Sequence, residues 1–256
     1  MNTLVPHILV TNDDGVTSPG LHALLGAMRQ FGQVSLVAPD VGRSAVGHAI
    51  TRDAPLRVTE FALDGRPVGF AVSGTPADCV QLAVKVLLAR PPDLVVSGIN
   101  LGPNTAKNVI YSGTVSAATE ARILGIPAIA ISIGAFNDPL WDTAAAYAEH
   151  FARLVLRRGL PPKVTLNVNV PNLPLGDVKG IRVTRQGNSG YDERFELRSD
   201  AAPDPDYWAE GTYRMSDVDE DTDALALDHG FVSVTPITFD LTAYSMLDDL
   251  SSWEPR

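Results

Sequence analysis

Short apolar runs alternate with amphipathic segments along about the first 170 residues of the chain. The runs are rich in Val, Ile and Leu, which is typical of parallel strands that are buried on both faces. The expected strands are residues 7–12, 33–38, 70–72, 93–97, 126–133 and 164–170. Alternation of this kind predicts an α/β fold, with a mostly parallel sheet covered by helices on both faces.

Local capping signals mark where helices begin between these strands. Ser18 followed by Pro19 predicts a helix start, because a hydroxyl caps the first turn and proline suits its first position. Thr75, Pro76 and Asp78 predict a second start that resembles a capping box. Two further helices are expected over residues 115–124 and 138–158.

The pattern changes after about residue 175. Residues 179–185 predict a strand, and residues 186–224 are rich in Gly, Pro, Asp and Arg with scattered aromatic side chains. Since a structureless insert of this length is uncommon in a compact domain, we expect an extended arm or hairpin that packs on a partner subunit. A strand over residues 230–241 then returns to the core. The expected division is therefore a catalytic core over residues 1–178 and a C-terminal extension over residues 179–256.

Charge narrows the possible partners. The formal net charge of −10 argues against binding of a nucleic-acid polymer, which needs a basic surface to neutralise phosphates. A small phosphorylated substrate remains compatible, because a bound divalent metal reverses the local field of an acidic site. The acidic run over residues 217–223 is expected to be a solvated loop.

Cysteine content and hydropathy narrow the class of protein further. Cys79 is the single cysteine, so an intrachain disulfide and a thiolate metal cluster are excluded, and its apolar neighbours predict a buried helical position. No segment reaches the roughly 18–20 apolar residues of a membrane span, and no signal peptide is evident at the N-terminus. We expect a cytoplasmic protein with no membrane partner.

The first loop with candidate chemistry holds two adjacent carboxylates, Asp13 and Asp14, directly after the first expected strand. Ligands of open parallel sheets bind at the carboxyl ends of strands. Carboxylate oxygens are ligands that Mg²⁺ and Mn²⁺ prefer. A plain polar turn ending at Gly15 is the alternative.

Two more loops follow expected strands and should lie near the first. One contains Arg43 and Ser44, which offer a charge for phosphate and a neutral oxygen for a metal. The other contains Asn100 and leads to the segment over residues 112–114, where unpaired N–H groups at a helix start could hold an anion. Each of these loops could also be an ordinary turn. His48 follows the second loop and is a weak candidate for proton transfer.

Several common motifs are absent from the sequence. It contains no Gly-x-x-x-x-Gly-Lys-Ser/Thr loop, no Gly-x-Gly-x-x-Gly after a strand and no Gly-x-Ser-x-Gly turn. The five histidines show no metal-ligand spacing. These absences disfavour ATP hydrolysis of the P-loop type, dinucleotide binding and serine hydrolase chemistry.

Taken together, the loops resemble the SurE family of survival-protein nucleotidases. The matching motifs are Asn12-Asp13-Asp14-Gly15, Ala38-Pro39-Asp40 with Arg43-Ser44, Gly74-Thr75-Pro76-Ala77-Asp78, Ser97-Gly98-Ile99-Asn100, Tyr111-Ser112-Gly113-Thr114, Asn167-Val168-Asn169 and Val232-Ser233-Val234-Thr235-Pro236. The resemblance covers nearly the whole chain. It implies a Rossmann-like three-layer core and a C-terminal arm that is exchanged between the subunits of a homodimer or homotetramer.

The resemblance also implies a function and a site. The function is hydrolysis of nucleoside 5′- and 3′-monophosphates by a phosphatase that holds one divalent metal, Mg²⁺ or Mn²⁺, per subunit. The implied metal ligands are Asp13, Asp14, Ser44 and Asn100. The implied phosphate-binding residues are Asn104, Ser112, Gly113 and Thr114. The residues expected to take part in catalysis are Asp13, Asp14 and Asn104.

Four positions depart from the family pattern: Ala45, Gly47, Ala106 and Asn108. The family usually has glycine at the first and third of these, so Ala106 reshapes its turn if that position needs a positive φ. None of the four is an implied metal ligand, so the departures bear on substrate preference more than on activity.

Other functions remain open on the sequence. They are hydrolysis of polyphosphate or of a broader set of phosphate esters, and nucleotide sensing without catalysis. A covalent phosphate on Asp13 is a rival mechanism, although both carboxylates are expected to bind the metal.

Overall fold

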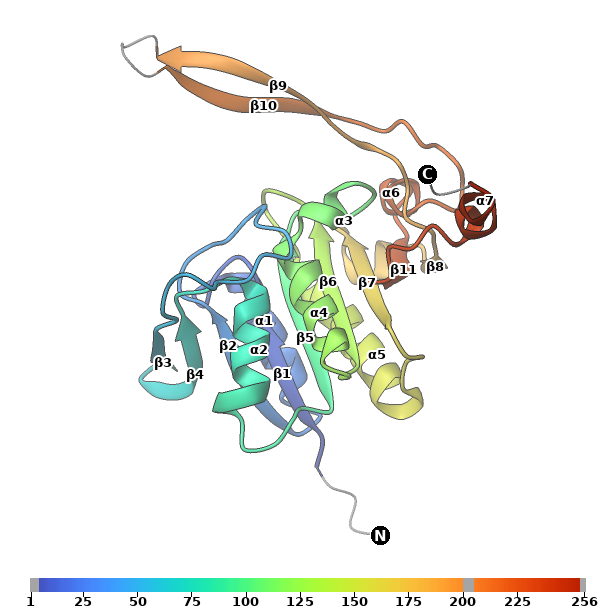
Figure 1. The fold of residues 1–256 in the computed structure, drawn as a ribbon. Coiled ribbons are helices and arrows are strands. Elements are labelled where there is room, and N and C mark those ends of the chain that lie inside the picture. The colour runs from blue at the N-terminus through green and yellow to red at the C-terminus, as the bar shows by residue number, and fades with distance from the viewer. Residues whose placement is uncertain (1–4, 200–204, 254–256) are drawn as a thin grey trace.

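A large sheet forms the centre of the molecule in the computed structural model, which describes residues 5–199 and 205–253. Its strands are β1 (His7–Thr11), β2 (Gln33–Pro39), β3 (Val58–Leu63), β4 (Arg66–Val72), β5 (Leu94–Leu101), β6 (Ala128–Gly134), β7 (Val164–Pro171), β8 (Ile181–Val183) and β11 (Val232–Thr238). Their order across the sheet is β3-β4-β2-β1-β5-β6-β7-β11-β8 (Figure 1).

Six neighbouring strands, from β4 to β7 in the sheet order, run parallel. At the two sides of this block, β3 pairs antiparallel with β4, and β11 pairs antiparallel with β7. The prediction of an α/β fold with a mostly parallel sheet is confirmed. Two strand predictions were incomplete, because β3 was not predicted and β4 is longer than residues 70–72.

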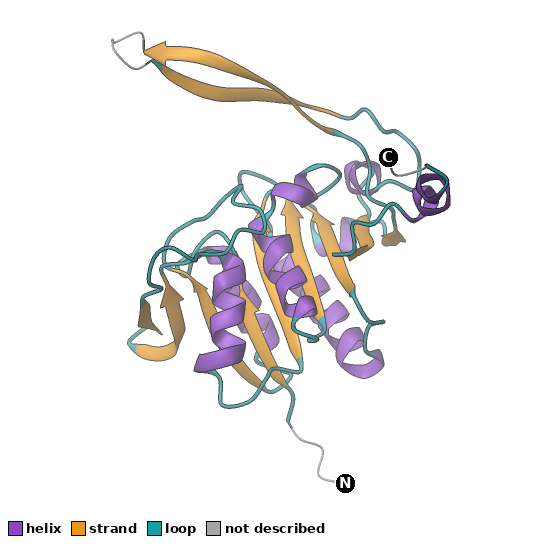
Figure 2. Ribbon diagram, viewed as in Figure 1, coloured by secondary structure: helices purple, strands orange, loops and turns teal. Residues whose placement is uncertain are grey.

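Helices cover both faces of the sheet, which gives three layers (Figure 2). The helices of the described residues are α1 (Pro19–Met28), α2 (Pro76–Leu82), α3 (Asn108–Tyr111), α4 (Gly113–Ile123), α5 (Trp141–Arg158), α6 (Asp223–Asp228) and α7 (Leu247–Ser251), of which α1, α2, α4 and α5 pack on the faces of the sheet. A π-helical turn, η1 (Ala83–Leu87), continues α2, and two 3₁₀ turns, η2 (Leu175–Asp177) and η3 (Tyr244–Met246), lie in loops. Within the described residues, no helix combines the length and the apolar character that crossing a bilayer requires.

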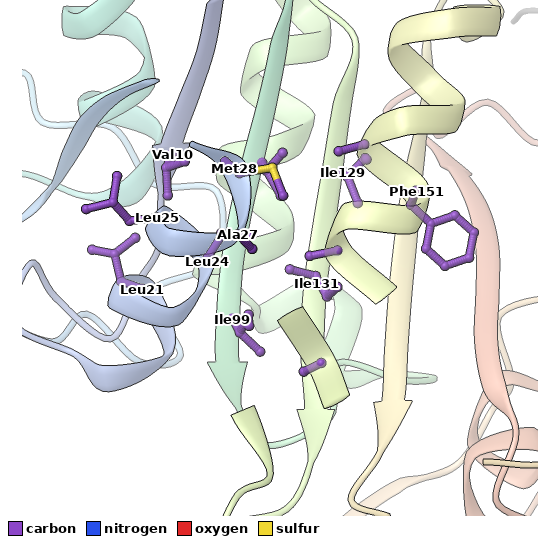
Figure 3. Packing of buried hydrophobic residues seen from close by; sticks show 14 of the residues in the cluster. Val10, Leu21, Leu24, Leu25, Ala27, Met28, Ile99, Ile129, Ile131 and Phe151 are labelled. Carbon is purple, nitrogen blue, oxygen red and sulfur yellow. The ribbon is translucent and has the colours of Figure 1, made fainter. Parts of the chain in front are cut away.

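Two apolar clusters hold the layers together. One lies between the sheet and the pair α1 and α5, where Leu24, Met28 and Phe151 pack with Val10 and Ile131 (Figure 3). The other lies between the opposite face and the pair α2 and α4. Successive residues of a strand point to opposite faces, so the continuous apolar run of β1 supplies both clusters.

The capping residues act as the sequence predicts. The Ser18 hydroxyl accepts a hydrogen bond of 3.2 Å from the Leu21 N–H. Thr75 accepts a bond of 3.1 Å from the Asp78 N–H, and the Asp78 carboxylate accepts one of 2.9 Å from the Thr75 N–H. This reciprocal pair satisfies N–H groups that a helix start leaves without partners. Cys79 is fully buried in α2, as predicted.

The C-terminal extension contains a hairpin and strands that return to the sheet. The hairpin consists of β9 (Gly190–Ser199) and β10 (Asp206–Arg214), which pair antiparallel and extend away from the sheet (Figure 1). The predicted hairpin is therefore present, and the predicted returning strand is β11. The expected ranges 1–178 and 179–256 include residues 1–4, 200–204 and 254–256, which lie outside the described residues.

The acidic run over residues 217–223 is only partly a solvated loop. Three of its carboxylates, Asp217, Asp219 and Asp221, form ion pairs with Arg185 at 3.0, 2.7 and 3.0 Å. Asp223 differs, because it is fully buried and accepts hydrogen bonds from the backbone N–H groups of Ala106, Gly187 and Ala224. The prediction of a solvated loop was wrong for Asp223.

Candidate active site

The candidate site is a cavity of about 610 Å³ at the carboxyl ends of the parallel strands. Its lining includes six of the eight predicted site residues, which are Asp13, Asp14, Ser44, Asn100, Asn104 and Ser112. Asp13 and Asp14 follow β1, Ser44 lies in the loop after β2, and Asn100 lies at the end of β5. The strand-end rule that selected these loops therefore places their side chains around one cavity.

Asp13 is held by the first turn of α4. Its side chain is almost fully buried, and its carboxylate accepts a hydrogen bond from the Thr114 hydroxyl. A side chain at position 113 would clash, since a Cβ on Gly113 would lie 2.7 Å from the Cβ of Asp13. Burial raises the pKa of Asp13 above its ordinary value, although hydrogen bonds from Thr114 and Gly113 act in the opposite direction.

The three residues predicted at this helix start have different positions. Ser112 lines the cavity, and its hydroxyl accepts a bond of 3.1 Å from the Val115 N–H as the cap of α4. Thr114 is fully buried, so its hydroxyl orients Asp13 and does not line the cavity. Gly113 allows the close approach of Asp13.

Asp14 lines the same cavity as Asp13, and its ionised form is also disfavoured there. Burial, followed by the negative charge of Asp13, raises the pKa of Asp14 to about 6. The Leu101 N–H donates a bond of 3.2 Å to its carboxylate. Among the described residues that line the cavity, none is a lysine, an arginine or a histidine. The two carboxylates therefore lack a cationic side chain in the cavity that would neutralise them.

The neutral side chains of the site fit a hard divalent cation. The Asn100 amide nitrogen donates a bond of 2.7 Å to the Gly102 carbonyl, which makes its amide oxygen the atom that remains for a ligand. Ser44 contributes a hydroxyl to the same lining. The described residues contain no cluster of three His, Cys, Asp or Glu side chains that could hold a metal. Two carboxylates with neutral oxygens are a donor set that suits Mg²⁺ or Mn²⁺.

Asn104 is held in place by hydrogen bonds to side chains of β6 and β7. Its amide nitrogen donates a bond of 2.9 Å to Ser132, and its backbone N–H donates one of 2.7 Å to Asn169. Asn167 and Asn169 both donate to the Asn104 carbonyl, at 2.8 and 3.1 Å. An amide nitrogen carries two N–H groups, so one bond to Ser132 leaves a second donor.

Several residues of the site were not predicted from sequence. Phe136, Tyr111, Tyr191 and Glu193 also line the cavity. Phe136 follows the end of β6, so the strand-end rule could have selected it. Tyr191 and Glu193 belong to the hairpin, and no local signal connects them with the site.

His48 lies away from the acidic cavity. Its ring nitrogen Nε2 lies 2.8 Å from the carboxylate of Glu120, which is almost fully buried on α4. His48 lines a separate cavity together with Ile110 and Thr119. The structure therefore does not bring His48 into the lining of the acidic cavity.

Three of the four departures from the family pattern occupy unusual backbone conformations. Ala45 and Ala106 have φ of 56° and 51°, and Gly47 has φ of 60°. Glycine adopts such angles at little cost, whereas alanine is strained there. Asn108 lines the cavity, so its change from the family pattern lies at the site itself.

Comparisons with known proteins find similarity over nearly the whole chain. A sequence model of the family described as "Survival protein SurE" matches residues 8–193. The chain is 48% identical over 246 residues to the 5'-nucleotidase SurE of Syntrophobacter fumaroxidans, covering 96% of this chain and 98% of that protein. It is 42% identical over 253 residues to the 5'-nucleotidase SurE of Chlorobium chlorochromatii, covering 99% and 93%. The crystal structure of the SurE protein from Aquifex aeolicus matches with a TM-score of 0.85 and 43% identity, over 96% of this chain and 98% of that one.

Proposed function

This chain belongs to the SurE family, and we propose on that premise that it is a metal-dependent phosphatase of nucleoside 5′-monophosphates. Its relatives in Syntrophobacter fumaroxidans and Chlorobium chlorochromatii carry the name 5'-nucleotidase SurE. The observation that carries the proposal for this chain is the adjacent pair of carboxylates, the buried Asp13 and the partly buried Asp14, in a cavity whose described lining contains no cationic side chain. A phosphate dianion enters such a cavity only with a cation.

Asp13, Asp14, Ser44 and Asn100 would hold one Mg²⁺ or Mn²⁺ ion. The bound cation would supply positive charge to the phosphoryl oxygens. Uncatalysed hydrolysis of a phosphate ester is very slow, so this stabilisation of negative charge is the main requirement for catalysis. Thr114 holds the Asp13 carboxylate in one orientation, and the Leu101 N–H does the same for Asp14. The protein therefore presents both carboxylates in fixed positions before any ligand binds.

Asn104 and Ser112 would bind the phosphoryl group itself. The bonds of Asn104 to Ser132 and Asn169 fix its amide at the floor of the cavity, with one N–H group left to donate. Ser112 lies at the start of α4, where the helix dipole favours an anion. Neutral donors of this kind add no charge and keep the orientation of the phosphoryl group fixed.

The C-terminal hairpin would mediate self-association. Its two strands pair only with each other in the described sheet topology, and Phe195, Leu197 and Tyr207 are exposed on it. Exchange of this arm between the subunits of a homodimer or homotetramer would bury these side chains. We also propose that the protein acts in the cytoplasm, where nucleoside monophosphates are available.

Phosphate release from a panel of substrates tests the proposed activity. The panel contains nucleoside 5′- and 3′-monophosphates and polyphosphate, each with Mn²⁺, Mg²⁺ or EDTA. We expect metal-dependent release from the 5′-monophosphates that EDTA abolishes. We expect the Asp13→Asn variant to be at least about a hundredfold slower, as is typical when one stabilising group of an active site is removed.

Two controls separate the site from the fold. Asp53→Asn removes an exposed carboxylate outside the cavity and should leave the activity unchanged. Calorimetric titration with Mn²⁺ should give one site per chain in the wild type and weak or no binding in Asp13→Asn. Nucleotide binding without hydrolysis would favour a sensor, and release from polyphosphate alone would point to a polyphosphatase; either result would overturn the nucleotidase proposal.

A further inference from the structure

A second cavity of about 210 Å³ adjoins the acidic cavity and has aromatic walls. Its lining includes Phe136, Tyr191, Tyr213 and Met215. Four residues, Pro103, Asn108, Phe136 and Tyr191, line both cavities, so the two spaces share a common boundary. A ligand whose phosphate lies near Asp13 and Asp14 can therefore extend into this aromatic cavity.

The rings of this cavity come from distant parts of the chain. Phe136 lies in the loop after β6, whereas Tyr191 and Tyr213 lie on the paired strands of the hairpin. The two tyrosine rings meet edge to face, with 5.5 Å between their centroids. This contact fixes one wall of the cavity.

Phe136 forms the other aromatic wall. The side chain is 62% exposed although it lies against the backbone of Gly102, where a Cβ would come within 2.6 Å of the ring. Gly102 has φ of 103°, a conformation that strains other residues. The glycine thus lets an apolar ring rest at the rim of the cavity, where a flat partner can stack on it.

The charges of the aromatic cavity decide which end of a ligand it accepts. Its described lining contains Asp228 and no lysine or arginine. A phosphate group would be repelled there, whereas a nucleobase is neutral, has two π faces and carries N–H groups that a carboxylate accepts. Stacking on aromatic side chains is the common way in which proteins hold a base.

We propose that this aromatic cavity binds the base of the substrate, that it favours purine over pyrimidine nucleoside 5′-monophosphates, and that Phe136 and Tyr191 set this preference. The proposal rests on the proposed nucleotidase function. Purines gain more than pyrimidines because their two fused rings cover a larger area of Phe136 and Tyr191.

Steady-state kinetics with matched substrates tests the proposal. We would compare kcat/KM for AMP, GMP, UMP and ribose 5-phosphate, which has the same phosphate and sugar but no base. Phe136→Ala and Tyr191→Ala should each lower kcat/KM about tenfold for AMP and GMP, in keeping with the usual contribution of base stacking. The loss should be about threefold for UMP and less than twofold for ribose 5-phosphate.

Phe195→Ala is the matched control variant. Phe195 is exposed on the same strand as Tyr191 and does not line either cavity. It should keep the wild-type preference for purines. An equal loss on ribose 5-phosphate and on AMP in the two cavity variants would overturn the proposal, because it would show that the rings support the fold or the phosphate end. An unchanged ratio of AMP to UMP would overturn it as well.

A binding measurement distinguishes this proposal from the proposed function. Saturation-transfer NMR with adenosine and uridine requires no hydrolysis. Stronger transfer to adenosine in the wild type, reduced in Phe136→Ala but not in Phe195→Ala, would support the base site even in a protein that releases no phosphate. Absence of transfer to either nucleoside from a protein that hydrolyses AMP would overturn the base site and leave the nucleotidase function intact.

Discussion

The body of the molecule and its hairpin both contain large apolar side chains on paired strands, but these side chains are buried in the body and exposed on the hairpin. In the body, β1 contributes Ile8, Leu9 and Val10, all fully buried between two layers of helices. In the hairpin, Phe195 is 70% exposed and Leu197 is 52% exposed. Both regions contain paired strands with large apolar side chains, yet only the body has a layer above and below them.

This difference bears on how each region is stabilised. A body with two apolar clusters gains stability by burying its own surface. An isolated two-stranded hairpin is at best marginally stable in water. The hairpin therefore requires another surface, and the proposed exchange of the arm would supply this surface from a second copy of the chain. Four substitutions, in the body, in the hairpin and where the two meet, test this difference.

The largest effect is expected at Asp223, where the two regions meet. Its carboxylate accepts the N–H of Ala106, in the site loop, at 2.8 Å and the N–H of Gly187, at the base of the hairpin, at 3.0 Å. Asp223→Ala would leave these buried N–H groups without partners, each at a cost of about 1–3 kcal/mol. We expect urea unfolding to show a loss of about 3 kcal/mol.

Asp219→Ala is the control, because it removes a neighbouring carboxylate of the same acidic run. Asp219 is 76% exposed, and its ion pair with Arg185 lies at the surface. Exposed pairs contribute about 0–1 kcal/mol, so its loss should hardly change the unfolding midpoint. Similar losses in both variants would show that the whole run, and not the buried carboxylate, ties the hairpin to the body.

The next effect concerns association. Leu197→Asp places a charge on an exposed apolar position of β9, so we expect the dissociation constant of the oligomer to rise more than tenfold. The free energy of unfolding, measured in dilute protein, should change by less than about 0.5 kcal/mol, because the side chain contributes little to the body. Sedimentation equilibrium and urea unfolding measure the two quantities.

Glu196→Gln provides the comparison for this variant. Adjacent residues of a strand point to opposite faces, so Glu196 lies on the other side of β9 from Leu197. If both variants weaken association equally, the interface does not depend on the apolar face. If the wild type is a monomer at all concentrations, the proposed exchange of the hairpin is wrong.

The same contrast explains what the sequence could predict. The body was predictable because its strands are buried on both faces and its helices begin at clear caps. The edge strand β3 and its neighbour β4 have few buried residues, so their hydrophobic pattern is weak, and the Asp64-Gly65 turn between them is the kind of signal that could have indicated a hairpin. A strand was expected over residues 93–97, but β5 continues to Leu101, and at Gly98 the backbone lies so close to Ile131 that a Cβ would not fit.

The site was predictable in location but not in its internal contacts. The rule that loops at strand ends converge brought Asp13, Ser44 and Asn100 to one cavity. The bond between Asp13 and Thr114 joins residues that are 101 positions apart, and no local pattern encodes it. The burial of Asp223 was missed for the same reason, since its partners lie in two other loops.

The third effect is expected at Asp14 in metal-free protein. The pKa of Asp14 is raised to about 6, so the folded state binds its proton more tightly than the unfolded chain does. The protonated carboxyl of Asp14 therefore favours the folded state, and this contribution to the free energy of unfolding is complete below about pH 4 and is lost as the pH rises through 6. Asp14→Asn cannot ionise, so with EDTA at pH 7.5 it should be about 1 kcal/mol more stable than the wild type, after allowance for solvent screening.

Urea unfolding in EDTA at pH 4.5 and pH 7.5 measures this effect. The advantage of the variant should largely vanish at the lower pH, and added Mn²⁺ should stabilise the wild type more than the variant. A variant that is less stable than the wild type at both pH values would show that the carboxylate supports the fold by its hydrogen bond to Leu101, and not that it is strained by burial beside Asp13.

The smallest effect is expected at Ala45, beside Ser44. Ala45 is exposed and has φ of 56°, which costs an alanine roughly 1–2 kcal/mol relative to a right-handed conformation. Ala45→Gly removes this strain but adds freedom to the unfolded chain, which offsets about 0.4–1 kcal/mol. We expect a net stabilisation of about 0.5 kcal/mol in urea unfolding.

Ala106 provides the control. It has φ of 51° but is fully buried, so Ala106→Gly also loses the burial of a methyl group, about 0.8 kcal/mol, and should gain no stability. An equal gain in both variants would mean that backbone strain alone decides the outcome at these two turns of the site.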